Sequence, residues 1–280
     1  MLLTTVLLLA ATVAGAVCGV VGGFEGINWL WILPLGFVAA FVLFAALAFG
    51  FLWLMCKRVD QNKPQENDSK FYRTLMHLYV DAALTLARVT VKTSGMEQTP
   101  KTGRFLLVCN HIDNLDPAFL LTCFRKSQLA FISKREVQSF FLVGELMHKI
   151  LCQPINREND REALKTILKC IQIIKEDKAS IAVFPEGYIK PDKKLHHFRH
   201  GVFKIATKAK VPIVVCTLRD TRYVLGNLLH LKPSTVEIRL LQVIQPEEYE
   251  NLTTVELSDK IYRMMAEDLG PELVSQEENA

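Results

Sequence analysis

Two long apolar stretches open the chain of 280 residues, and nearly all of its charge follows them. Residues 1–21 are apolar or small apart from threonines and a cysteine, and residues 27–56 carry no charge. About 20 helical residues cross a bilayer core, so both stretches are long enough to span it. Residues 22–26 are glycine-rich and predict the turn between them. Because backbone polar groups in lipid must be satisfied within the segment, the pattern predicts a transmembrane helical hairpin over residues 1–56.

The distribution of basic residues predicts the orientation of this hairpin. Lys57, Arg58 and Lys63 follow the second stretch, whereas the connecting turn contains no Lys or Arg. The positive-inside rule then places the rest of the chain, and the amino terminus, in the cytoplasm of a multi-pass cell-membrane protein. A cleaved signal peptide is the alternative for the first stretch, because Ala14-Gly15-Ala16 resembles a cleavage site. The lack of a basic residue before that stretch favours the uncleaved hairpin.

Beyond a polar linker at residues 57–70, apolar residues recur with alternating strand and helix patterns. Helical spacing first predicts a helix over Phe71–Val89, which either docks on the domain or lies on the membrane surface. Strands and helices that alternate favour an α/β domain over residues 71–280, with a largely parallel sheet flanked by helices. The predicted strands are Phe105–Cys109, Leu129–Ser133, Ile181–Phe184, Ile213–Leu218 and Val236–Val243, and the predicted helices are Pro117–Phe124, Val137–Lys149, Arg161–Lys175, Val202–Lys210 and Ser258–Leu269.

Charge and cysteine content narrow the classes of partner. A net charge of +4 is compatible with anionic lipid and gives no indication of nucleic acid. The seven cysteines form no CxxC pair and stand mostly in apolar surroundings. They are therefore expected as reduced, buried thiols of a cytosol-facing domain, with neither disulfides nor a metal site.

One candidate catalytic pair follows the first predicted strand. Asn110-His111 leads to Asp116-Pro117, so an imidazole and a carboxylate stand five positions apart where a strand ends and a helix begins. Asp116 is predicted as the helix N-cap with Pro117 at the first helical position. A carboxylate bonded to one ring nitrogen fixes the tautomer, so the other nitrogen can accept a proton. Taken alone, the spacing also fits a histidine that only caps a turn.

A second candidate block is Phe184-Pro185-Glu186-Gly187, which follows the apolar run Ile181–Val183. Ligands of open α/β sheets gather beyond the carboxyl ends of strands, where this block and His111 are both expected. Basic residues crowd the following segment, and Arg157 is a further cation. Such charges bind phosphate well, although a solvated surface with a structural turn has the same composition.

Four blocks together resemble the glycerophospholipid acyltransferases, especially the bacterial 1-acylglycerol-3-phosphate acyltransferases. The resemblance covers about residues 104–218, and Lys134 stands where the family often has a lysine near the phosphate. The blocks, in the family's order, are Asn110-His111 through Asp116, Ile155-Asn156-Arg157, Phe184-Pro185-Glu186-Gly187 and Val211-Pro212-Ile213-Val214.

The resemblance implies a role for each matched position. His111 would act as general base on the acceptor hydroxyl, and Asp116 would orient it. Lys134 and Arg157 would hold the acceptor phosphate. Glu186 would bind an acceptor hydroxyl or order the loop, with Gly187 allowing close approach of the backbone. The acyl donor would be a thioester of acyl-carrier protein or coenzyme A, with no further cofactor and no metal. Membrane lipid would supply the acceptor, and the product would be phosphatidic acid.

Two departures from the family pattern leave the acceptor open. Asp113 stands where the family usually has a small polar residue, and Ile189 replaces the arginine expected after the third block. Lys190, Lys193 or Arg199 could supply the missing charge. Otherwise the acceptor would be a different lysolipid or glycerol-3-phosphate.

Two further alternatives belong to other classes of protein. The first is a metal-dependent hydrolase, since His196 and His200 have the spacing of a helical metal pair. Cations beside them, such as Lys193 and Arg199, disfavour a metal ion. The second is a non-catalytic lipid-binding protein that keeps the fold, against which the intact His111–Asp116 pair argues.

Overall fold

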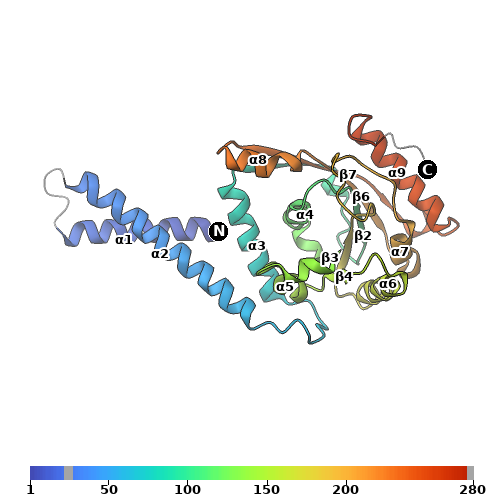
Figure 1. Ribbon diagram of the computed structural model, residues 1–280, viewed down its shortest axis with the longest axis horizontal. Coiled ribbons are helices and arrows are strands. Elements are labelled where there is room, and N and C mark those ends of the chain that lie inside the picture. The colour runs from blue at the N-terminus through green and yellow to red at the C-terminus, as the bar shows by residue number, and fades with distance from the viewer. Residues whose placement is uncertain (22–27, 276–280) are drawn as a thin grey trace.

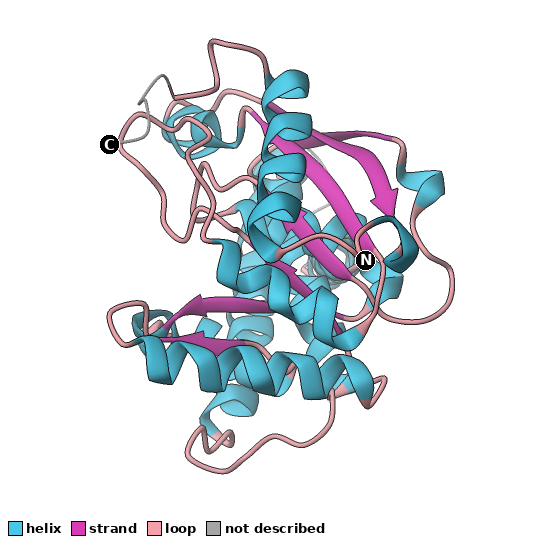
Figure 2. Ribbon diagram, turned by 90° about the vertical axis from the view of Figure 1, so that its right-hand side faces the viewer, coloured by secondary structure: helices cyan, strands magenta, loops and turns pink. Residues whose placement is uncertain are grey.

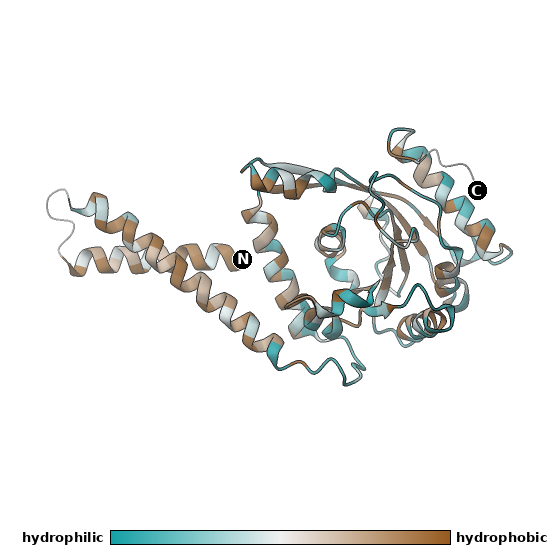
Figure 3. Ribbon diagram, viewed as in Figure 1, coloured by the Kyte–Doolittle hydropathy of each residue, from teal (hydrophilic) through white to brown (hydrophobic). Residues whose placement is uncertain are grey.

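The computed structural model describes residues 1–21 and 28–275, and the predicted turn at residues 22–26 lies outside them. Helices α1 (Leu2–Val20) and α2 (Trp29–Lys57) extend together from one side of the α/β domain (Figure 1). Both are long and apolar enough to cross a membrane, by length and composition. They pack closely, since a Cβ on Gly36 would lie 3.6 Å from Cα of Ala14. Apolar residues predominate along both helices (Figure 3).

Helix α3 (Lys70–Leu86) joins the hairpin to the domain. The Tyr72 and Tyr79 hydroxyls donate to backbone carbonyls of α2, at 3.0 and 2.6 Å. Arg73 is buried against Asp68 and also donates to the carbonyl of Leu129 at 2.9 Å. Leu75 is buried on the domain side. The predicted helix is therefore confirmed, and it docks on the domain.

Seven strands form one sheet in the order β1-β7-β6-β2-β5-β3-β4. All neighbouring pairs are parallel except β6–β7, which are antiparallel. Helices cover both faces: α3, α4 and α5 lie on one side, and α6, α7 and α9 on the other (Figures 1 and 2). The predicted α/β class is thus confirmed. The strands are β1 (Val89–Ser94), β2 (Leu106–Cys109), β3 (Leu129–Lys134), β4 (Gln153–Ile155), β5 (Ser180–Val183), β6 (Ile213–Arg219) and β7 (Ser234–Ile244).

The predicted strands and helices of the domain lie where the sequence pattern places them, with two exceptions. Helices α4 (Asp116–Cys123), α6 (Asp160–Lys175) and α9 (Thr254–Leu269) match predicted helices. The continuous helix predicted over residues 137–149 is wrong. It is a 3-10 turn (Arg135–Ser139) followed by α5 (Val143–Lys149), because Phe140 is extended and Leu142 has a φ of 64°. The break brings Gly144 so close to the carbonyl oxygen of Gln138 that a Cβ would not fit.

The second exception is the helix predicted over residues 202–210, which begins as a 3-10 turn (His200–Phe203) before α7 (Lys204–Ala209). Three short elements were not predicted: edge strands β1 and β4, and α8 (Val224–Leu229). All seven cysteines are free, and six of them are buried, as expected for reduced thiols. The core is formed by the five inner strands and the helix faces that pack on them.

Candidate active site

The sheet brings the two candidate blocks together. Strands β2 and β5 are parallel neighbours, with Leu106 opposite Ile181, so the segments that follow them leave the same edge. Asn110 fixes the end of β2 to β6, because its side-chain amide donates to the Leu218 carbonyl at 3.0 Å and its Oδ1 accepts from the Leu218 N–H at 2.7 Å. His111 therefore starts its loop from a rigid position.

Asp116 is the anchor of the His111 loop. Its Oδ2 lies 2.9 Å from Nδ1 of His111 and accepts from the backbone N–H groups of Ile112 (2.7 Å) and Asp113 (2.9 Å). The side chain is fully buried. The prediction that Asp116 is the N-cap is wrong, because it is the first residue of α4 and its carboxylate turns back to these preceding N–H groups. Pro117 is therefore the second helical residue and not the predicted first, although it still lies in the first turn.

This contact determines the proton positions on His111. Since a carboxylate accepts hydrogen bonds, Nδ1 carries the proton and Nε2 of the neutral ring is left as a proton acceptor. The imidazole keeps 15 % exposure, so the ring is shielded yet reachable. The Phe184 ring stacks on it, with centroids 4.1 Å apart and planes 13° apart. Hydrogen bond and stacking together fix the ring orientation that a general base needs.

Glu186 is buried and connects the loop after β2 with the loop after β5. It is 3 % exposed, and its Oε1 accepts from the His111 N–H at 2.8 Å while Oε2 accepts from the His196 N–H at 3.0 Å. Burial raises the pKa of Glu186 to about 8, although the two N–H donors oppose that shift. Of its two predicted roles, ordering the loop agrees with this geometry, because both carboxyl oxygens already hold backbone groups.

Gly187 forms the turn on which an arginine rests. Its φ of +86° is a conformation that glycine adopts without strain. A Cβ at this position would lie 3.0 Å from Nε and 3.1 Å from Cδ of Arg199, so the Arg199 side chain lies directly over the turn. The Arg199 N–H also donates to the Pro185 carbonyl at 2.8 Å. Of the three cations considered at the sequence level, Arg199 is therefore held against the third block.

Arg157 is half-buried and close to this second arginine. Burial and the positive charge of Arg199 lower the pKa of Arg157, while Glu136 acts in the opposite direction. Glu136 is itself paired with Lys134 at 3.0 Å. Within residues 1–21 and 28–275, no carboxylate pairs with Arg157 or Arg199. The two guanidinium groups interact electrostatically and neither forms an ion pair with a carboxylate of the described residues, so both are candidates to bind an anion.

Lys134 ends β3, opposite Ile155 of β4 and thus beside the second block. Its side chain is mostly exposed (61 %) and pairs with Glu136. Lys134 thus lies at the predicted edge of the sheet, but its ammonium group is paired with Glu136. Unlike Lys134, Arg157 and Arg199 have no ion-pair partner among the described residues.

The helical histidine pair of the hydrolase alternative is absent from the described chain. His196 lies in a loop, where its Nε2 is 2.9 Å from Oδ1 of Asp192, and His200 starts a 3-10 turn. The two histidines therefore do not share one helix face. In the described part of the chain, no group of three or more His, Cys, Asp or Glu side chains is arranged to hold a metal ion.

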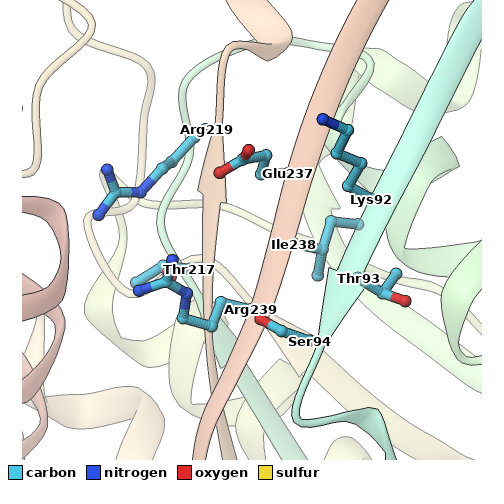
Figure 4. Close-up of a pocket in the computed structure, with 8 residues that line it drawn as sticks. All are labelled: Lys92, Thr93, Ser94, Thr217, Arg219, Glu237, Ile238 and Arg239. Carbon is cyan, nitrogen blue, oxygen red and sulfur yellow. The ribbon is translucent and has the colours of Figure 1, made fainter.

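A separate pocket of about 200 Å³ lies over β1, β7 and β6 (Figure 4). It is lined by Lys92, Arg219, Glu237 and Arg239, among others. Asp268 of α9 accepts from Arg239 at 2.6 Å and also binds Arg219, so these cations are partly neutralised. None of the predicted site residues lines this pocket, and it is not part of the candidate active site.

Sequence analysis missed two supporting residues. Phe184 was noted only as part of the third block, and Asn110 only as the start of the first. The signal for Phe184 was available, because Phe184 and His111 each follow closely on one of two strands that the pattern places in the same sheet. The clamp between Asn110 and Leu218 depends on the order of the strands, which the pattern does not determine.

Comparisons with known proteins identify the family of the chain. A family model described as Acyltransferase matches residues 90–219. The probable 1-acyl-sn-glycerol-3-phosphate acyltransferase of Mycoplasma pneumoniae is 32 % identical over 196 residues, which are 69 % of this chain and 68 % of that protein. The corresponding protein of Mycoplasma genitalium is 28 % identical over 255 residues, covering 86 % and 92 % of the two chains.

A solved structure shows the same fold. The crystal structure of the 1-acyl-sn-glycerophosphate acyltransferase PlsC from Thermotoga maritima superposes with a TM-score of 0.60 at 21 % identity, over 79 % of this chain and 86 % of that one. The fold and these relatives define an α/β enzyme of the acyl-transfer class. The chain belongs to the glycerophospholipid acyltransferase family.

Proposed function

We propose that this acyltransferase moves a fatty acyl group from an acyl thioester to the free hydroxyl of 1-acylglycerol-3-phosphate, which gives phosphatidic acid. The observation that carries the proposal is the contact between Nδ1 of His111 and the buried carboxylate of Asp116. Arg157 and Arg199, which interact electrostatically and have no ion-pair partner among the described residues, support an acceptor that carries a phosphate. Relatives that cover most of the chain are named for this same reaction.

The chemistry follows from the proton positions on His111. Nε2 removes the proton of the acceptor hydroxyl, whose oxygen attacks the thioester carbonyl carbon. The tetrahedral intermediate collapses, the carbon–sulfur bond breaks, and the imidazolium returns the proton to the leaving thiolate. The buried Asp116 carboxylate stabilises the imidazolium between these steps. The chain has no GxSxG nucleophile elbow, which favours direct attack over an acyl-enzyme.

The acceptor phosphate lies between Arg157 and Arg199 in this proposal. The family usually has an arginine at the position that Ile189 occupies here. Arg199 supplies that charge in this chain, because its side chain rests on Gly187 of the same block. Lys134 can join when phosphate competes with Glu136 for its ammonium group. The donor is a thioester of coenzyme A or of acyl-carrier protein, and no metal takes part in any step.

Membrane attachment is part of the proposed function. Helices α1 and α2 would span the cell membrane as a hairpin, with the α/β domain on the cytoplasmic side beyond Lys57. Length and composition of the two helices support this topology. The acceptor and the product are both lipids, so an active site held at the bilayer has direct access to each.

Acceptor selectivity of an Arg199→Ala variant tests the phosphate site. A charge-assisted hydrogen bond contributes about 1.5–3 kcal/mol, so the KM for lysophosphatidate should rise by about 10- to 100-fold. Lys190→Ala is the matched control, since its ammonium group lies 5.3 Å from the Tyr188 ring centroid, and its KM should change little. A neutral monoacylglycerol offered to both variants separates phosphate binding from general damage. An unchanged KM in Arg199→Ala would remove Arg199 from the site.

A further inference from the structure

Helix α8 and the turn after it carry unusually exposed leucines. We call residues 223–231 the α8 tip. Leu229 is 83 % exposed and Leu231 is 79 % exposed, the two highest values for large hydrophobic side chains among the described residues that follow α2. Tyr223, Leu225 and Leu228 are also exposed. Five exposed large apolar side chains within nine residues are more than the singly scattered ones of an ordinary surface, and such a concentration indicates contact with a protein or a membrane.

The α8 tip is held in this conformation by specific bonds. Nη1 of Arg88 donates to the Leu231 carbonyl at 3.0 Å, and the Lys232 N–H donates to the Asn227 carbonyl at 2.8 Å. Leu231 has a φ of 54°, which is costly for a branched residue. The chain therefore accepts local strain at a position where a leucine side chain faces solvent. A contact that buries this side chain would offset that cost.

The charge around the tip indicates what covers it. The tip and its flanks, residues 221–233, include Arg222 and Lys232 and contain no Asp or Glu, and Asp220 just before them is the one acidic residue between positions 220 and 236. Arg88, which bonds the tip, adds another cation. Leucines surrounded by basic residues fit the interface of an anionic bilayer, where acyl chains take the apolar groups and headgroups take the charges.

The position of the tip agrees with this surface. Figure 1 shows α8 and α3 along the side of the α/β domain from which α1 and α2 extend. Phe141, exposed by 63 %, belongs to the same side, since its ring centroid lies 6.3 Å from that of Phe49 in α2. Apolar residues also mark α8 in Figure 3. We propose that the α8 tip is a second membrane contact, in which Leu229 and Leu231 enter the acyl region of an anionic bilayer.

This contact would orient the active site. Helix α8 follows the carboxyl end of β6, and this is the edge of the sheet from which His111 also extends. With α2 at one corner and the α8 tip at another, the domain cannot rotate freely about the hairpin. The edge that carries His111 then stays at the membrane surface, a consequence that rests on the proposed function.

Spin labelling of the full chain tests the proposal without an activity assay. A nitroxide on Leu229→Cys, in vesicles of phosphatidylglycerol and phosphatidylcholine, should collide more often with oxygen than with a water-soluble nickel chelate. A label on Leu168→Cys, a leucine of α6 that is 56 % exposed on the other side of the sheet, should show the reverse. Six of the seven native cysteines are buried and should react little with the spin label. The parent chain, treated with the same label, measures the background signal from the native cysteines.

A label on Val38→Cys in α2 separates this proposal from the proposed hairpin topology. Lipid contact at positions 38 and 229 supports both. An aqueous label at position 229 overturns the second membrane contact, whatever the label at position 38 reports. Shielding from oxygen and nickel alike at position 229 also overturns it, since that result indicates a protein partner such as a second copy of the chain.

Discussion

Asp116→Asn tests how the buried carboxylate supports His111. The side chain keeps its shape, and its amide oxygen can take the place of Oδ2, which accepts from the N–H groups of Ile112 and Asp113 and from Nδ1 of His111. The loop and the tautomer are then retained, and the negative charge is lost. The variant therefore isolates the electrostatic part of the contribution of Asp116.

The size of that part follows from the geometry. Two unit charges about 4 Å apart interact by about 4 kcal/mol at an effective dielectric constant of about 20, which corresponds to about 10³-fold in rate as an upper value. We expect kcat to fall by about 10²–10³-fold with KM nearly unchanged, because the charge matters only when the imidazolium forms. The new amide nitrogen takes the place of Oδ1, which is buried without a hydrogen-bond partner among the described residues. This should also destabilise the fold by about 1–3 kcal/mol.

The assay compares initial rates of acyl transfer by purified variants, with the unfolding midpoint measured in the same detergent. Asp113→Asn is the matched control, because Asp113 is buried in the same loop and its Oδ1 accepts only from the Leu115 N–H at 3.1 Å. Its kcat should stay within about threefold of the parent value, as for a lost local hydrogen bond. Equal losses in the two variants, or a kcat for Asp116→Asn close to that of the parent, would refute the reasoning.

Two further predictions concern stability. Burial raises the pKa of Glu186 from 4.5 to about 8, so the folded state holds this proton more tightly than the unfolded chain. Its contribution to stability is complete below about pH 4.5 and is lost as the pH rises through about 8. The unfolding midpoint should therefore fall across this pH range, and it should fall less in Glu186→Gln. An equal dependence of the midpoint on pH in both proteins would contradict the prediction. Asp68 and Arg73 form a buried ion pair with side chains 4 % and 8 % exposed. Asp68→Ala should therefore lower the free energy of unfolding by about 3–5 kcal/mol. Asp60→Ala, which breaks an exposed pair with Lys63, should leave that free energy nearly unchanged. Similar denaturant midpoints for the two variants would contradict this prediction.

Much of the fold could be predicted because its central strands are continuous apolar runs. Strands β2, β5 and β6 are buried on both faces, so their residues leave a clear pattern. The edge strand β4 is only three residues long and depends on pairing with β3. The break before α5 comes from the extended Phe140 and the positive φ of Leu142, which helical periodicity does not reveal.

The candidate site divides in a similar way. His111 and Asp116 are near in sequence, so their contact could be predicted from one loop. Arg157 and Arg199 come together only through the sheet and a long loop after β5. The sequence shows that each arginine could bind a phosphate. It does not show that Arg199, and not Lys190 or Lys193, lies against the third block, because that depends on how the Arg199 side chain rests on Gly187.

The most direct test of the central claim is acyl transfer by His111→Ala. Purified full-length protein is given a labelled acyl thioester, of coenzyme A and of acyl-carrier protein in turn, with lysophosphatidate as acceptor. His197→Ala is the control, since His197 is exposed and stacks on Tyr262 with centroids 5.1 Å apart. The account predicts labelled phosphatidic acid from the parent and the control, and a rate about 10²–10⁴-fold lower in His111→Ala. Phosphatidic acid formed at the parent rate by His111→Ala would contradict it.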